Sequence, residues 1–394
     1  DRLFSWPFLF VMLSGLAYFI GVGAMMPTLP RFVEDELGGE GFQVGLSVGA
    51  FAVSAALLRP WIGRVGDVRG RRILIVAGAA VAGVSMIAYG AVDSLVLLIG
   101  LRLVTGAGEA AFFTGLVTVN QDLAPDNRRG EAASYFSVSL YGGLAFGPPL
   151  GEELLDATSF GVVFLVFGGT CLLGAAVGLL VPKGKTLAEP VARKMLHPVA
   201  LWPGIVIALG LVPITAYAAF LPVYADSVGF DNVGRVLLLY GGLVLVIRIV
   251  AARVPDALGW RRTSVVALSG AAAGVGMIGL WGTAAAVWVG TVVLALGMSL
   301  LYPALMAAVM GATDESERSH AVGTFTLFLD ISMGLGAALV GVVISLTNQR
   351  SGFVVAGLCA VGGLVALALL RNRIGQPATA VSPSGTSIAA EPTS

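Results

Sequence analysis

The chain carries one short charged pattern twice, half a chain apart. Residues 63–72 read GRVGDVRGRR, and residues 252–262 read ARVPDALGWRR. Three pairs of residues are separated by 189 positions: Asp67 and Asp256, Arg59 and Arg248, and Gly70 and Gly259. Each copy ends one long apolar run and begins another. A half-chain period in a strongly apolar sequence predicts two similar helical bundles.

Composition excludes a soluble globular domain. Apolar residues make up 57% of the chain and charged residues 12%, against roughly 45–50% and roughly 25% in globular chains. Cys171 and Cys359 lie in separate apolar runs and read as packing residues, and two histidines are too few for a metal cluster. No Walker-type phosphate loop and no hydrolytic triad occurs in the sequence. We therefore expect no enzyme activity and no cofactor.

Twelve apolar runs are long enough to cross a bilayer, which takes about 20 residues. They lie near residues 6–28, 41–62, 73–92, 95–119, 131–151, 160–181, 200–223, 233–252, 263–282, 285–310, 319–346 and 352–370. The sequence predicts an all-α membrane protein with twelve transmembrane helices in two pseudo-symmetric six-helix bundles. The expected division is a first bundle at 1–182, a cytoplasmic linker at 183–199, a second bundle at 200–374 and a disordered tail at 375–394.

The basic residues are distributed very unevenly between the two sides of the expected membrane. With the N-terminus inside, 17 of the 23 lysines and arginines fall in inner segments and 3 in outer segments. Arginine and lysine concentrate on the cytoplasmic side of membrane proteins. We expect both termini in the cytoplasm. The strong excess of arginine over lysine is typical of a GC-rich bacterial genome, so the expected location is a bacterial inner membrane.

The first copy of the repeat resembles motif A of the major facilitator superfamily, through Gly63, Asp67, Gly70, Arg71 and Arg72. The resemblance covers essentially the whole chain. It implies that Asp67 lies at the cytoplasmic start of the eleventh span, near Ser319 and His320, and helps to hold the inner side shut. The alternative is that the arginines only set orientation. The second copy departs from the motif, because Ala252 replaces the first glycine and Trp260 precedes the arginine pair.

The fifth span ends in a segment that resembles motif C of the same superfamily. Its residues are Gly143, Gly147, Pro148 and Gly151. Glycine and proline remove side-chain bulk and a backbone donor, so a helix can bend and pack tightly there. Motif C is typical of antiporters, especially drug:proton exporters. The alternative is an ordinary helix kink, and Glu152 stands where the motif has a final glycine.

Ionisable residues inside spans are costly and mark candidate functional sites. Arg102 and Glu109 share one face of the fourth span, and Asp330 lies within the eleventh. Arg102 resembles the arginine of the family's motif B, which is linked to proton transfer. We expect Glu109, Asp330 and Arg102 to couple transport to protons. The alternatives are a static Arg102–Glu109 pair and a polar interhelical contact of Asp330.

Arg59 and Arg248 lie near the inner ends of the second and eighth spans. Snorkelling to the interface explains them, and so does a shared gating role, which their repeated position eight residues before each aspartate favours. By family analogy, tentative substrate-cavity residues are Tyr18, Phe112, Tyr217 and Tyr302.

The resemblance implies a secondary transporter, driven by the proton gradient, that exports small amphipathic or hydrophobic compounds by alternating access. The expected partners are a small-molecule substrate, protons and the lipid bilayer, with no nucleic acid, and we expect a monomer. Alternatives are a proton-coupled symporter, an exporter of a specific metabolite, metallophore or lipid, and a transporter-like sensor.

Overall fold

The computed structural model describes residues 3–39, 41–183, 195–228, 233–370 and 372–375, and within these ranges the chain is helical with short turns. The elements of the first half are α1 Trp6–Asp35, α2 Gly41–Arg69, α3 Arg71–Ala88, η1 Tyr89–Ala91, α4 Leu95–Asp122, η2 Asp126–Arg128, α5 Arg129–Ala157 and α6 Phe160–Gly178. Those of the second half are α7 Pro198–Ser227, α8 Val233–Val250, α9 Val254–Leu258, α10 Trp260–Trp281, α11 Ala284–Gly311, η3 Glu315–Glu317, α12 Arg318–Leu346 and α13 Gln349–Leu369.

The spacing of 189 residues seen in the charged pattern extends to whole elements. Adding 189 to the bounds of α4, η2 and α5 gives the bounds of α11, η3 and α12. Gly70 and Gly259, which precede α3 and α10, both have a positive φ, 93° and 77°. Only glycine adopts such a conformation at no steric cost, so the sharp break before α3 and α10, within each copy of the pattern, requires it. The two halves are therefore structural repeats.

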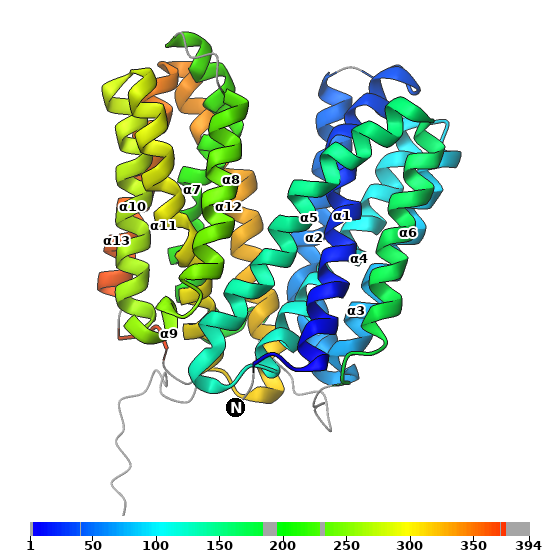
Figure 1. Cartoon of the computed structure of the whole chain (residues 1–394), viewed down its shortest axis with the longest axis horizontal. Helices are drawn as coiled ribbons and strands as arrows, with labels where there is room; N and C mark the ends of the chain where they lie inside the picture. The colour runs from blue at the N-terminus through cyan, green and yellow to red at the C-terminus, as the bar shows by residue number, and fades with distance from the viewer. Residues whose placement is uncertain (1–2, 40, 184–194, 229–232, 371, 376–394) are drawn as a thin grey trace, which may run out of the picture.

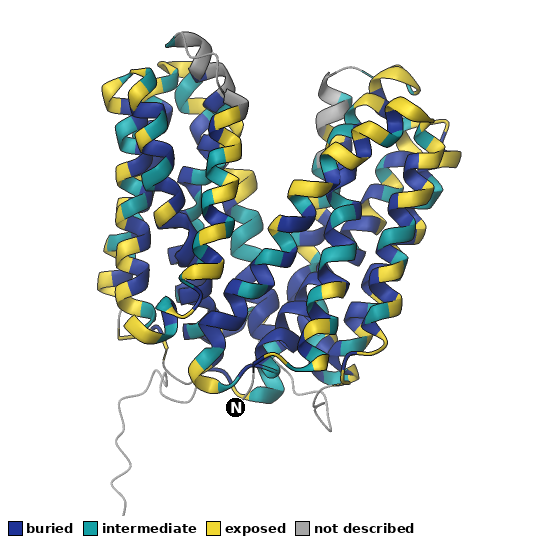
Figure 2. Cartoon of the chain, in the orientation of Figure 1, coloured by how far each residue is buried: buried dark blue, intermediate teal, exposed yellow. Residues whose placement is uncertain are grey.

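The helices form two groups that meet at one end of the molecule (Figure 1). Helices α1 to α6 pack on one another, and so do α7 to α13. Between the groups, α2 and α4 contact α12, and α5 contacts α8 and α11. We call the end at which α1 begins the joined end, and the other, where the ribbons diverge, the far end. Buried residues concentrate toward the joined end (Figure 2).

Nine of the described helices are long and apolar enough to cross a membrane, by length and composition. The sequence predicts twelve spans, and the three others fall on α2, α5 and α8. Each of these three helices contacts the opposite group. Several helices are longer than the predicted spans: α1 continues to Asp35, α2 to Arg69 and α5 to Ala157.

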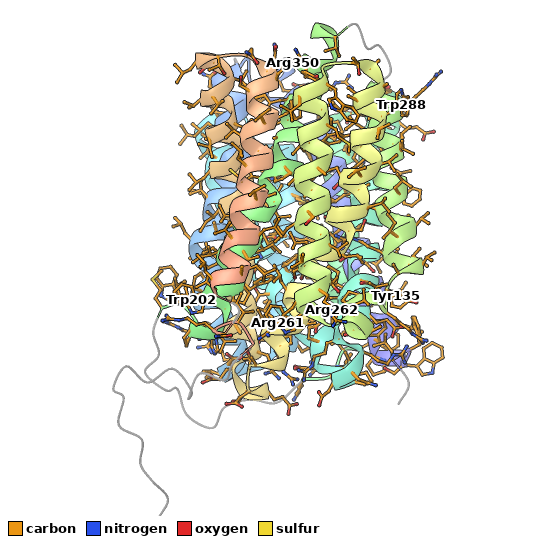
Figure 3. All side chains as sticks on the ribbon, turned by 90° about the vertical axis from the view of Figure 1, so that its left-hand side faces the viewer. Tyr135, Trp202, Arg261, Arg262, Trp288 and Arg350 are labelled. Carbon is orange, nitrogen blue, oxygen red and sulfur yellow. The ribbon has the colours of Figure 1, made fainter. Side chains whose placement is uncertain are left out.

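Tryptophan and arginine side chains lie at both ends of the second half (Figure 3). Trp202, Arg261 and Arg262 lie toward the joined end, and Trp288 and Arg350 lie toward the far end. Tryptophan and arginine prefer the interfaces of a bilayer, so these residues bracket its apolar thickness. The predicted linker at 183–199 and tail at 375–394 lie largely outside the described residues, and the domain boundaries stay predictions.

Candidate functional site

Arg59 on α2 lies between two carboxylates that come from different helices. Its Nη2 donates to both carboxylate oxygens of Glu109 on α4, at 3.2 and 3.0 Å. Its Nε donates to Oδ2 of Asp330 on α12 at 2.5 Å, and Nη2 reaches Oδ1 at 3.3 Å. The Phe113 ring lies under the guanidinium, 5.0 Å from its carbon atom. Arg59 therefore joins the two halves of the molecule through a three-residue cluster, in which Arg59 and Glu109 are buried and Asp330 is half-buried.

Small residues bring α12 close enough to α2 for this contact. A Cβ at Gly323 would lie 2.6 Å from the carbonyl oxygen of Arg59, and one at Gly63 would lie 2.5 Å from that of Ser319. Real Cβ atoms do not approach so closely, so a larger side chain at either position would push the two halves apart. Gly63, predicted as part of the gate, therefore sets the distance between α2 and α12.

Two interpretations of the arginines are wrong. Arg59 is only 5% exposed and bonded to two acids, so it does not snorkel to the interface. Arg102 does not pair with Glu109. Its Nε donates to the carbonyl oxygen of Ser47 at 3.0 Å and its guanidinium stacks on Phe51. Arg102 and Glu109 are seven positions apart on α4, which is about two helical turns. Each instead binds a nearer residue of α2, Ser47 for Arg102 and Arg59 for Glu109.

Arg248 is also buried, at 3% exposure, but its environment differs from that of Arg59. Its guanidinium carbon lies 4.4 Å from the centre of the Tyr141 ring on α5. Among the described residues, no carboxylate lies within ion-pair distance of it. Arg248 therefore contacts the opposite half through an aromatic ring instead of an acid.

Asp67 caps the start of α12 at the joined end. Its two carboxylate oxygens accept the backbone N–H groups of Ser319 and His320, both at 3.1 Å. Asp67 is 1% exposed. The first N–H groups of a helix have no partner within the helix, and the helix dipole favours a negative charge there. The first half thus supplies the cap for a helix of the second half.

Asp256 makes the reciprocal contact. It accepts the N–H groups of Gly130 and Glu131 at the start of α5, at 2.9 and 2.8 Å. These donors stand 189 positions before the two that bind Asp67. Burial raises the pKa of the Asp256 carboxyl above its ordinary value, while the two N–H groups act in the opposite direction. The two halves therefore cap each other symmetrically.

Sequence reasoning missed an ion network beside Asp67. Arg71, which is fully buried, pairs with Asp122 at 2.9 Å and donates to the Ser319 side chain. Asp122 also pairs with Arg318 at 2.7 Å, across the halves. Arg72 instead donates to the Leu179 carbonyl of its own half at 3.3 Å, so this predicted gate residue does not reach the opposite half through that contact. The only available signal was the position of Asp122 at the end of an apolar run.

The segment that resembles motif C packs α5 against α1. A Cβ at Gly147 would lie 2.5 Å from the Ile20 carbonyl, and one at Gly151 would lie 2.8 Å from that of Ala24. Gly143 meets Phe19 and Ile20 in the same way. Pro148 lies inside the continuous helix. The glycines therefore form a stripe that brings the two backbones into contact.

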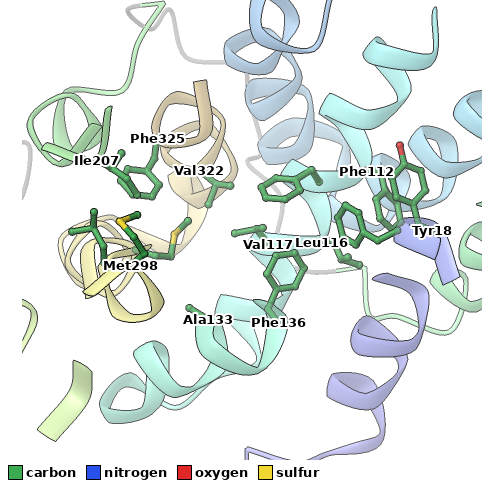
Figure 4. Packing of buried hydrophobic residues seen from close by; sticks show 14 of the residues in the cluster. Tyr18, Phe112, Leu116, Val117, Ala133, Phe136, Ile207, Met298, Val322 and Phe325 are labelled. Atoms are coloured by element: carbon green, nitrogen blue, oxygen red, sulfur yellow. The ribbon is translucent and has the colours of Figure 1, made fainter. Parts of the chain in front are cut away.

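The tentative cavity residues lie mostly in the cores of the halves. Tyr18, Phe112 and Tyr217 have no exposed surface. The rings of Tyr18 and Phe112 stack at 3.9 Å (Figure 4), and Tyr217 hydrogen-bonds the Thr291 hydroxyl at 2.9 Å. In this conformation these three pack as core residues. Tyr302 is half-buried and is the one of the four that retains exposed surface.

The two histidines of the chain meet at the joined end. The rings of His197 and His320 are 5.2 Å apart, and Nε2 of His197 lies 3.1 Å from a Glu317 carboxylate oxygen. Within the described ranges, no group of three or more metal-ligating side chains occurs.

Comparison with known proteins agrees with this architecture. The sequence profile described as Major Facilitator Superfamily matches residues 11–294. An uncharacterized MFS-type transporter of Salmonella typhimurium is 26% identical over 364 residues, covering 89% of this chain and 93% of its own. One from Burkholderia pseudomallei is 26% identical over 368 residues, covering 90% and 89%. The crystal structure of the human organic anion transporter MFSD10 superposes with a TM-score of 0.79 at 18% identity, covering 91% of this chain and 98% of that one. The chain therefore belongs to the Major Facilitator Superfamily, as a multi-pass secondary transporter with the all-helical fold of that family and not as an enzyme.

Proposed function

We propose that the protein is a proton-coupled antiporter that exports small amphipathic or hydrophobic compounds by alternating access. The observation that carries the proposal is the cluster in which the buried Arg59 binds Glu109 of its own half and Asp330 of the other. A site that holds two acids and one base, and that joins the two moving parts, can link proton binding to their movement.

The charges of the cluster explain how a proton would act. With all three groups ionised the cluster carries one excess negative charge, which is costly away from water. A proton on Glu109 or Asp330 removes that charge and weakens one of the two ion pairs with Arg59. Loss of the Arg59–Asp330 pair would detach α12 from α2, so protonation would favour separation of the joined end.

The positive-inside bias assigns the direction of the cycle. With both termini in the cytoplasm of a bacterial inner membrane, the joined end is the cytoplasmic end. The conformation is then outward-facing, with Asp67 and Asp256 as the cytoplasmic gate. A proton entering from outside would open this gate, and substrate from the cytoplasm would favour loss of the proton and return. The membrane potential adds about 2.3 kcal/mol per charge per 100 mV.

The glycine stripe of α5 supports antiport over symport. Gly143, Gly147 and Gly151 lock α5 to α1 and carry the resemblance to the antiporter motif. The rocking parts would then be rigid, and movement would concentrate where α5 contacts α8 and α11.

Reconstituted vesicles test the proposal. We expect vesicles with an acidic interior to accumulate an amphipathic fluorescent probe that has no titratable group, and vesicles that carry the Glu109→Gln/Asp330→Asn variant to lose this accumulation. The exposed variant Glu153→Gln on α5 serves as the matched control. Accumulation only with an acidic exterior would indicate a symporter, and binding without flux would indicate a sensor. Full accumulation by the double variant would refute the site assignment.

A further inference from the structure

Arg248 occupies the place in the second half that Arg59 occupies in the first, yet it has no acidic partner among the residues that the structure describes. It is 3% exposed on a helix that faces the opposite half. The ring of Tyr141 covers its guanidinium at 4.4 Å, and its Nε is buried with no hydrogen-bond acceptor among the described residues. A buried cation within a membrane protein is costly unless an anion compensates it. The missing anion calls for an explanation.

The repeat identifies the residues that stand around Arg248 where the partners of Arg59 stand in the first half. Shifting by 189 positions relates four pairs of residues: Arg59 to Arg248, Asp330 to Tyr141, Glu109 to Met298, and Phe113 to Tyr302. Contacts are conserved with the positions, since Arg59 meets Asp330 and Arg248 meets Tyr141. Both carboxylates of the first cluster are thus absent from the second, while the arginine remains.

A second buried donor accompanies Arg248. The hydroxyl of Tyr302 is buried and has no hydrogen-bond partner among the described residues. Tyr302 lies on α11, which packs against α8, the helix of Arg248, and against α5, the helix of Tyr141. The first half has Phe113 at this position, which carries no such group. Both groups lack an acceptor within the part of the chain that the structure describes, so they can donate to a ligand with anionic oxygen atoms.

We propose that Arg248 and Tyr302, under the ring of Tyr141, bind the anionic group of an amphipathic organic substrate, a carboxylate or a sulfonate. Tyr141 belongs to the opposite half and is 40% exposed, so a ligand between the bundles reaches the guanidinium by displacing this ring. The tyrosine rings favour an organic body over an inorganic ion. The inference deepens the proposed function and rests on it, because it assigns the substrate to the same inter-bundle space.

In this proposal the first half takes up the proton and the second half binds the substrate. In the first half, the partners of the arginine are part of the chain and can take up a proton. In the second half, the partner of the arginine is the cargo. The same arginine position thus serves proton coupling once and substrate recognition once.

Binding by the purified full chain at neutral pH in chloride-free buffer tests the site, with naphthoate, naphthamide and naphthylmethylammonium as probes. These share one apolar body and differ in charge. We expect wild type to bind naphthoate at least about tenfold more tightly than naphthamide, a difference of about 1.4 kcal/mol. Equal affinity for naphthoate and naphthamide, or tighter binding of the ammonium compound, would overturn the proposal.

Variants test which residues cause the preference for naphthoate over naphthamide. Arg248→Gln and Tyr141→Asp are each expected to abolish this preference. The second variant supplies an internal carboxylate where the first half has Asp330. Arg248→Lys should retain part of the preference, and Tyr302→Phe should reduce it about threefold. The matched control is Arg235→Gln, an exposed cation on the same helix, which should keep it. A preference that survives Tyr141→Asp would contradict the assignment even if Arg248→Gln failed to fold.

Two further outcomes separate related possibilities. Displacement of naphthoate by chloride or inorganic phosphate, at concentrations close to the Kd of naphthoate, would show that the site binds inorganic anions. The proposed organic substrate class would then be wrong. Charge preference in binding does not depend on a proton gradient. It can therefore fail while proton coupling holds, or hold while coupling fails.

Discussion

The Nε of Arg59 lies 2.5 Å from Oδ2 of Asp330, and this contact joins α2 of the first half to α12 of the second. The two residues are 271 positions apart in the chain. Because Arg59 also binds Glu109 within its own half, a change at one acid alters the balance at the other. In the proposed function, this arrangement links movement of the halves to the charge of the cluster.

Replacing Arg59 alone should lower the Tm more than replacing Arg59 together with Glu109 and Asp330. Arg59→Gln leaves the carboxylates of Glu109 and Asp330 without their common base, and loss of one partner of a buried pair costs about 3–5 kcal/mol. We expect a large drop in Tm for Arg59→Gln and partial recovery in Arg59→Gln/Glu109→Gln/Asp330→Asn. Thermal unfolding followed by circular dichroism measures both. Arg31→Gln, at an exposed ion pair, should change Tm little. Equal Tm values for the single and triple variants would show that the charges are not coupled.

Loss of the helix caps should loosen the joined end. Asp67→Ala and Asp256→Ala each leave two backbone N–H groups at a helix start without an acceptor. A charge at a helix start contributes about 0.3–1 kcal/mol, and up to ~2 kcal/mol when partly buried. Asp67 is the more deeply buried and has the Arg71 network beside it, so we expect the larger effect there. Cross-linking of cysteines placed across the joined end should become less efficient in both variants. Asp93→Asn, at an exposed turn, is the control, and an equal loss there would remove the basis for the caps.

Packing of α5 on α1 should not tolerate a methyl group. Gly147→Ala places a Cβ 2.5 Å from the Ile20 carbonyl and 2.7 Å from the Ala24 nitrogen, and overpacking of this kind costs about 1–3 kcal/mol. A Cβ at Gly169 on α6 would meet no atom within 4 Å. Gly169→Ala should raise Tm slightly, because alanine favours a helix over glycine by up to ~1 kcal/mol. If both substitutions moved Tm in the same direction, the packing argument would be unsupported.

The fold was largely predictable because hydrophobicity is a local property. Apolar runs separated by charged turns gave the helices, and the repeated pattern gave two related halves. The boundaries were less accurate where a helix continues through charged residues, as at Glu152 in α5 and Asp67 in α2. A backbone shielded by a neighbouring helix continues where a local pattern suggests an end.

The sequence was enough to predict the two acids of the candidate site, Glu109 and Asp330, but not Arg59 as their common partner. Glu109 and Asp330 stood out because a carboxylate within an apolar run is costly. Their common partner did not, because helical spacing pointed to Arg102 and no local pattern relates residues on different helices. The exact repeat of Arg59 and Arg248 was the available signal. It showed that these arginines are constrained, while their partners depend on how the two halves meet.

The most direct test of the account is a distance measured across the far end as the pH changes. Thr158 and Thr347 are exposed equivalent residues that follow α5 and α12. Thr158→Cys and Thr347→Cys, in a Cys171→Ala/Cys359→Ala background, can carry spin labels for pulsed electron paramagnetic resonance. We expect acidic pH to shift the distance distribution of the otherwise unmodified protein to shorter values, as the Arg59 cluster takes up a proton and the far end closes. The Glu109→Gln/Asp330→Asn variant should show one distribution at every pH. A wild-type distribution that ignores pH, or a double variant that keeps the shift, would contradict proton coupling through Arg59, Glu109 and Asp330.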